Sequence, residues 1–194
     1  ILLFSRLKCI KNHGLIISGN VIYGEAHEGG LYGKGCIFSF NIDSIITGGN
    51  GYTKLHEFNE TDGDFPGNTL TLSGSVLYGV TLRGGAHTAG TIFKINTDGS
   101  GFTTMHNFNT TDGKAPWGYL TLSGDVLYGA TWVGGLSGNG VIYSINTDGS
   151  GFSKLMDFNN TNGSQPWSVS LSGNVLYGIT IQGGDSSNGC IYKV

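Results

Sequence analysis

The sequence predicts an all-β fold, a small β-propeller built from four four-stranded blades. The first observation is a repeat: the motif SGSVLYGVTLRGG recurs with small changes, starting at Ser18, Ser73, Ser123 and Ser172. The second is that each unit contains short apolar segments, rich in β-branched and aromatic residues and separated by glycine-containing turns. The third is that none of these segments has the 3.6-residue periodicity of a helix. Four-stranded units at a period of about 50 residues are typical of propeller blades, and the alternative is a flat or solenoid array.

The second unit shows the four expected strands in order. They are LTLS from Leu70, VLYGVTL from Val76, TIFKIN from Thr91 and FTTMHNF from Phe102. A tight Ser-Gly-X turn joins the first strand to the second. The link between the third and fourth is Asn-Thr-Asp-Gly-Ser-Gly, whose glycines supply the positive φ angles of a turn. Each unit is therefore expected to form an antiparallel meander.

The chain divides into one repeat domain, residues 1–194. The first repeat departs from the pattern at IDSIITGGNGY, and the fourth stops at Val194, after its third strand. The N-terminal segment ILLFS resembles the end of the fourth strand in other repeats. We therefore expect this segment to complete the last blade, in the same molecule or in a neighbouring one. The expected blades are residues 14–67, 68–117, 118–167, and 168–194 together with 1–13.

Two of the three cysteines occupy the same repeat position. Cys36 lies in the first repeat and Cys190 in the last. In a closed ring these repeats are neighbours, so a disulfide between the two cysteines is one candidate arrangement. The alternative is that both are small buried residues on strands.

The strand order also predicts which loops share a face. The uniform turns after the first and third strands lie on one face, and the longer, variable loops lie on the other, where function is usually found. Trp117, Trp132 and Trp167 belong to the variable face. Indole rings surrounded by Asn, Asp and Ser suit a sugar-binding pocket. The alternative is that Trp117 and Trp167 fill gaps between blades.

Three Asn-X-Thr sequons fall at the same repeat position, just after the fourth strand. They begin at Asn59, Asn109 and Asn159, and Asn162 begins an overlapping one. In a secreted protein these sites are expected to carry glycans on one face. The alternative is that the Asn and Thr side chains stabilise the turn itself.

Composition and motifs argue against several other functions. The net charge is -3 and only 12% of residues are charged, so nucleic acid is not an expected partner. No apolar run approaches the roughly 18 residues of a membrane span. No catalytic, metal or cofactor motif occurs, and the residues unique to single repeats, Glu25, His27, Glu28 and Arg83, form no recognisable catalytic set. We expect a protein that is not an enzyme and has no cofactor.

The stretches VLYGVTLRGG, GTIFKINTDGSGF and HNFNTTDGKAPWG resemble a bacterial tandem repeat, the Gloeobacter–Verrucomicrobia repeat. The resemblance covers nearly the whole chain and implies an extracellular or cell-surface protein of repeated architecture. The leading hypothesis is a structural module that self-associates, as a homo-oligomer or fibre, into a surface layer or filament. The alternative is a carbohydrate-binding propeller that binds glycans on its loop-rich face.

Overall fold

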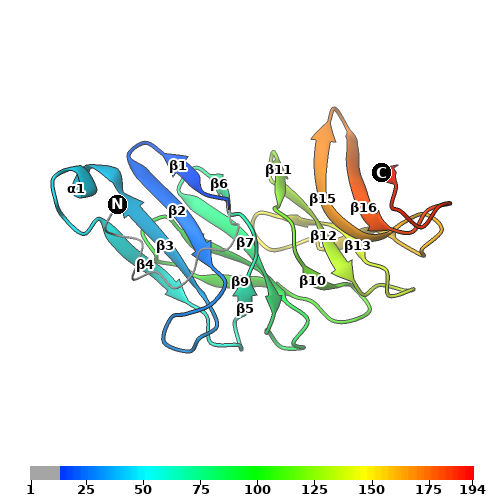
Figure 1. Ribbon diagram of the computed structural model, residues 1–194, viewed down its shortest axis with the longest axis horizontal. Coiled ribbons are helices and arrows are strands. Elements are labelled where there is room, and N and C mark those ends of the chain that lie inside the picture. The colour runs from blue at the N-terminus through cyan, green and yellow to red at the C-terminus, as the bar shows by residue number, and fades with distance from the viewer. Residues whose placement is uncertain (1–13) are drawn as a thin grey trace.

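The computed structural model describes residues 14–194, which form four antiparallel β-sheets. The sheets follow the order of the repeats and lie side by side along the longest axis of the molecule (Figure 1). Strands make up 54% of the described residues, so the predicted all-β class is confirmed. The first sheet contains β1 (Ile16–Ser18), β2 (Val21–Ala26), β3 (Cys36–Asn41) and β4 (Tyr52–Glu57).

The second and third sheets have the same plan. The second contains β5 (Asp64–Pro66), β6 (Thr71–Ser73), β7 (Val76–Arg83), β8 (Thr91–Asn96) and β9 (Thr103–Asn107). The third contains β10 (Lys114–Pro116), β11 (Thr121–Ser123), β12 (Val126–Val133), β13 (Val141–Asn146) and β14 (Ser153–Asp157). The fourth contains β15 (Ser164–Ser172), β16 (Val175–Gln182) and β17 (Ile191–Lys193).

The first strand of each later repeat begins earlier than the sequence predicts. Residues 64–66 pair with β7 of the second sheet, and residues 114–116 pair with β12 of the third. In the fourth sheet, β15 runs unbroken through the equivalent positions. These segments also join adjacent repeats, because Phe65 N donates to Lys34 O at 3.0 Å and Ala115 N donates to Ala89 O at 2.9 Å. The strand pairing thus places residues 64–66, 114–116 and 164–166 in the sheet that follows the blade to which the sequence analysis assigned them.

The departure of the first repeat at IDSIITGGNGY forms a short helix, α1 (Ile42–Ile46). It replaces the tight turn that links the third and fourth strands in the next two repeats. The Asn41 side chain caps it, since its Oδ1 accepts a hydrogen bond from Ser44 N at 3.1 Å. This helix is not anticipated by the sequence analysis, because the segment is too short to show helical periodicity.

Three seams between consecutive sheets hold most of the apolar core, and Ala26, Cys36, Phe38 and Phe40 of the first sheet form a further buried cluster. We name the face that a sheet turns to the next repeat its forward face, and the opposite one its rear face. Each seam packs the forward face of one sheet on the rear face of the next, burying aliphatic and aromatic side chains from both. The second seam buries Tyr78, Val80, Ile92 and Phe108 against Leu120, Leu127, Tyr143 and Ile145. The first and third seams use equivalent residues.

The four sheets form an open arc. The first sheet and the fourth lie at opposite ends of the molecule (Figure 1). The candidate Cys36–Cys190 disulfide is therefore wrong: no bond joins these two thiols, because the first and last repeats are not neighbours. The expected closing strand, Ile1–Ser5, lies outside the described residues.

Candidate functional sites

The loops divide between two faces as predicted. On one face, a hydrogen bond joins the two turns of the second repeat, in which Thr97 N donates to Ser75 O at 2.8 Å. On the other face the long loops meet, with Gly85 N donating to Glu60 O at 2.8 Å. The second face is the one that carries the predicted tryptophans.

A row of aromatic side chains runs across several repeats on this loop-rich face. Trp117 follows β10, and its ring lies 5.6 Å from Trp132 in β12 and 6.1 Å from Trp167 in β15. The row extends backward to Phe65, 6.5 Å from Trp117, and to His27, which lies 4.3 Å from Phe65. The three predicted tryptophans are thus brought together. Trp167 is 38% exposed and offers an accessible ring, whereas Trp117 and Trp132 are half-buried.

The row contains two members that the sequence analysis did not place in a site. His27 and Phe65 sit at repeat positions held elsewhere by Leu82 and Ala115, so only a structure could show that they meet. Arg83 adds a cation, since its guanidinium carbon lies 5.6 Å from the centre of the Phe65 ring. The indole N–H groups of Trp117 and Trp132 are buried and have no hydrogen-bond acceptor within residues 14–194.

A buried carboxylate lies near the start of this row. Glu25 is 3% exposed and sits in β2, where the later repeats have Val80 and Ala130. Neither of its carboxylate oxygens has a hydrogen-bond partner in the described part of the chain. Burial therefore raises the pKa of Glu25 well above its usual value. Glu25 faces Gly79 across the first seam. A side-chain carbon added to Gly79 would lie 3.0 Å from Glu25 Oε1.

The three predicted glycosylation asparagines take part in the turns that contain them. Asn59 Oδ1 accepts hydrogen bonds from both the backbone N and the Oγ1 of Thr61. Asn109 is half-buried, and its Nδ2 donates to Asp112 Oδ2 at 2.9 Å. Asn59 and Asn159 are exposed. A role in the turn is thus shown, and glycan attachment stays a prediction.

Two histidines stack on aromatic rings of the next repeat, one at each of the first two seams. The His56 ring stacks on Phe102 with centroids 3.6 Å apart, and His106 stacks on Phe152 at 3.8 Å. The Nε2 atom of His56 lies 3.0 Å from Asp62 Oδ2. Burial lowers the pKa of each histidine, and the neighbouring aspartate partly opposes that effect. These histidines are structural in the arrangement seen.

The fourth repeat exposes side chains that its neighbours bury. Tyr177, Ile179 and Ile191 are 42%, 56% and 81% exposed. The residues at the same positions of the second repeat, Tyr78, Val80 and Ile92, are 6%, 3% and 0% exposed. The forward face of the fourth sheet is therefore an uncovered version of a surface that forms a seam elsewhere.

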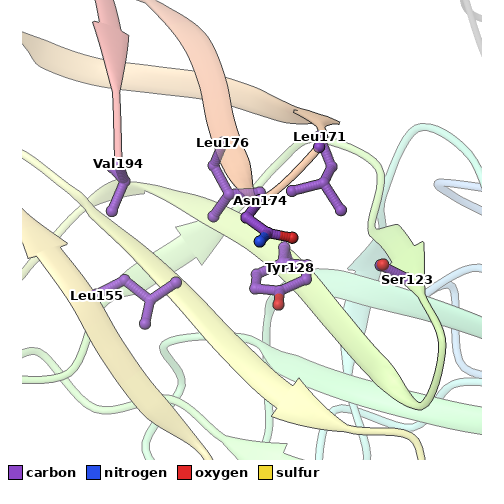
Figure 2. A pocket seen from close by; sticks show the side chains of 8 residues that line it. Ser123, Tyr128, Leu155, Leu171, Asn174, Leu176 and Val194 are labelled. Carbon is purple, nitrogen blue, oxygen red and sulfur yellow. The ribbon is translucent and has the colours of Figure 1, made fainter.

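A pocket of about 410 Å³ lies at the third seam (Figure 2). Tyr128 and Leu155 of the third repeat and Leu171, Leu176 and Val194 of the fourth line it. Its walls are largely apolar. Elsewhere in residues 14–194, no three His, Cys, Asp or Glu side chains lie close enough to hold a metal ion. No helix in the same part of the chain is long and apolar enough to cross a membrane.

The comparisons with known proteins identify the repeat. A family model of the Gloeobacter/Verrucomicrobia repeat matches residues 9–194, and the chain belongs to this family. A comparison with curated protein sequences finds no match.

Solved structures place the fold among β-propeller-like proteins. The putative TolB from Agrobacterium tumefaciens matches with a TM-score of 0.58 and 14% identity, over 96% of this chain and 66% of its own. A chain of the nidogen/laminin complex matches with a TM-score of 0.57 and 16% identity, over 83% of this chain and 52% of its own. At these identities the likeness shows the fold alone. The present chain spans about half to two thirds of these two structures.

Proposed function

We propose that the chain is a non-enzymatic extracellular structural module, a building block of a surface layer or filament that assembles head to tail. The four sheets act as propeller blades, and the arc is continued by another copy of the chain. The observation that carries this proposal is the uncovered forward face of the fourth repeat. An apolar face of this kind is unfavourable in water, because burying one such side chain contributes about 1.5–3 kcal/mol.

The first repeat offers a surface for the same contact. Leu15 is 56% exposed, whereas Leu70 and Leu120, at the same position of the next two repeats, are each 3% exposed. Placing the fourth repeat of one copy against Leu15 of the next would cover the exposed part of this face, whereas Phe38 and Phe40, at the positions of Phe93 and Ile95, are already buried. Such a contact uses two different surfaces, so it either closes into a ring or propagates as a fibre.

The test is the mass of the protein in solution as a function of concentration, measured by light scattering. The wild-type mass is expected to rise with concentration. Ile179→Lys, which charges the forward face, is expected to remain monomeric. Leu136→Lys is the matched control, because Leu136 is 83% exposed on a loop of the third repeat and should leave association unchanged. A wild-type protein that stays monomeric, or an equal loss of association in the control, would refute the proposal.

A second candidate function, carbohydrate binding, is supported by the aromatic row. Trp117 lies between two other indole rings, and Trp167 exposes enough surface to stack on the C–H face of a sugar. A glycan array separates the two candidates. Saturable binding that is lost in Trp167→Ala but retained in Tyr119→Ala, a substitution of another exposed aromatic residue, would favour the lectin. Absence of binding to any glycan would remove it.

A further inference from the structure

The first seam buries an acid at a position where the other two seams are apolar. Glu25, in β2, is 3% exposed, and so are Val80 and Ala130, the residues at its position in the next two repeats. Val80 and Ala130 pack in the apolar clusters of the second and third seams. A side-chain carbon added to Gly79 of the second sheet would lie 3.0 Å from Glu25 Oε1, so the carboxyl group points across the seam. The acid is therefore part of the contact between the first two repeats.

The ring that faces Glu25 gives its carboxyl group no hydrogen bond. Neither carboxyl oxygen has a hydrogen-bond partner within residues 14–194. Beside Gly79 lies the ring of Phe93, which ends in a C–H group. The third and fourth repeats have Tyr143 and Tyr192 at this position, and each places its hydroxyl group beside the corresponding glycine. The first seam thus combines a buried acid with a facing ring that has no hydroxyl group.

Three titratable side chains share the forward face of the first sheet with Glu25. They are Tyr23, His27 and His56. Tyr23 belongs to the apolar cluster of the first seam, and the His27 ring packs on Phe65 with centroids 4.3 Å apart. The Nε2 atom of His56 lies 3.0 Å from Asp62 Oδ2. None of these groups is a hydrogen-bond partner of Glu25 in the described part of the chain.

The second sheet faces Glu25 with uncharged side chains. They are Leu77, Gly79 and Thr81 of β7 and Thr91, Phe93 and Ile95 of β8. Farther along the sheet, Arg83 lies over the Phe65 ring, and Asp64 of β5 is paired with Lys34. The described residues therefore place no cation against the Glu25 carboxyl group.

An ionised carboxylate in this place would be a buried charge without a partner. Such a charge is costly, so the group either keeps its proton or moves into water. Burial accordingly raises the pKa of Glu25 well above its usual value. Because Glu25 lies in a paired strand and points at the second sheet, separation of the two sheets is the movement that brings water to its carboxyl group.

We propose that the first seam is held closed by the proton on Glu25, and that the first repeat separates from the second when the carboxyl group ionises. The chain between β4 and β5, residues 58–63, remains as the connection. From pH 4.5 up to the folded-state pKa, each pH unit favours the open form by up to about 10-fold, because the open form releases the proton more readily. The second and third seams have Val80 and Ala130 in place of the acid and should stay closed. This response does not depend on the head-to-tail contact proposed above.

The test is the rate at which a thiol reagent labels a cysteine buried in each of the first two seams. Ile95→Cys places a thiol in the first seam, and Ile145→Cys places one at the same position of the second. Peptide mass spectrometry follows the labelling of each site from pH 5 to pH 8. A buried thiol reacts only when its surroundings open, so its rate reports the opening equilibrium. The ratio of the two rates cancels the ordinary effect of pH on thiol reactivity. It also cancels the effect of His56 and His106, which occupy equivalent positions at the two seams.

The labelling rate at position 95, divided by that at position 145, is expected to rise with pH by up to about 10-fold per unit. Glu25→Gln and Glu25→Val, each added to both cysteine variants, should remove this rise. Glu28→Gln is the matched control and should retain it, because Glu28 lies at the margin of the first sheet and not inside the seam.

A ratio that does not change with pH would overturn the inference, since ionisation of Glu25 would then leave the seam closed. An equal rise in Glu25→Val would also overturn it, because another group would then be responsible. Circular dichroism over the same pH range checks that each variant is folded. Leu77→Cys and Leu127→Cys, both fully buried at equivalent positions of the two seams, supply a second matched pair if an isoleucine variant does not fold.

Discussion

The ring of Phe93 in β8 lies directly against Gly79 in β7, its cross-strand partner. A side-chain carbon on Gly79 would come within 2.4 Å of Phe93 Cζ. The same relation joins Gly129 to Tyr143 in the next repeat. The glycine of the repeated Leu-Tyr-Gly sequence is therefore required for packing, because an aromatic ring occupies the space of its missing side chain.

Gly79→Ala is expected to destabilise the protein by about 1–3 kcal/mol, the usual effect of an added methyl group in a packed core. Urea unfolding measures the change. In the double variant with Phe93→Leu the two losses should not add, since the smaller side chain makes room for the methyl group. Strict additivity of the two changes would contradict this explanation.

A buried threonine links the second and third strands of the third repeat. Thr131 Oγ1 donates to Val133 O at 3.0 Å and accepts from Val141 N at 3.2 Å. Thr131→Val should lower the free energy of unfolding by about 1–3 kcal/mol, because the Val141 N–H stays buried without an acceptor. Thr131→Ser retains the hydroxyl and should lose less. A Thr131→Val variant as stable as the wild type would show that the hydrogen bond does not contribute.

Glu25 predicts a loss of stability as the pH rises. Its pKa is raised in the folded protein, so the folded state keeps a proton that the unfolded state releases above pH 4.5. The unfolding free energy should therefore fall as the pH increases from that value through the folded-state pKa. Glu25→Val, which introduces the residue found at position 80, should remove this decline and raise stability at pH 7. Glu28→Gln, at an exposed position, should retain it.

The buried histidines should make the unfolding free energy depend on pH in the opposite direction. The pKa of His106 is lowered mainly by burial, so its contribution to stability is present above the unfolded value of 6.5 and is lost as the pH falls. Unfolding curves at pH 7.5 and 5 should show this loss in the wild type. His106→Met, which introduces the residue that the third repeat carries as Met156, should reduce it. If the unfolding free energy differs between pH 7.5 and pH 5 by the same amount in the variant as in the wild type, His106 is not the source of the loss.

Much of the fold follows from the repeat itself. The four strands of a unit are predictable because apolar runs and turn glycines alternate along it, and the division of loops between two faces follows from strand order alone. The short segments 64–66 and 114–116 are missed because three residues around a proline carry too little pattern to mark a strand. The placement of Cys36 and Cys190 is wrong because the sequence cannot distinguish a closed ring from an arc.

The site is predictable only in part. The repeat register brings Trp117, Trp132 and Trp167 to one face, and the structure shows that they meet. His27 and Phe65 join the aromatic row because their side chains meet across the first seam. No local sequence pattern predicts that contact. The pocket beside Leu155 is likewise invisible in the sequence, because it arises from what lies next to the residue in space.

The contacts between the proline of one repeat and a glycine of the preceding one have an evolutionary consequence. A side-chain carbon on Gly35 would lie 2.5 Å from Pro66, and Gly90 and Gly140 have the same relation to Pro116 and Pro166. Each unit thus carries one half of the joint to its predecessor and one half of the joint to its successor. Duplicating or deleting a unit in the gene therefore keeps a proline opposite a glycine at each joint. Lineages can therefore change the reach of the protein by copy number alone.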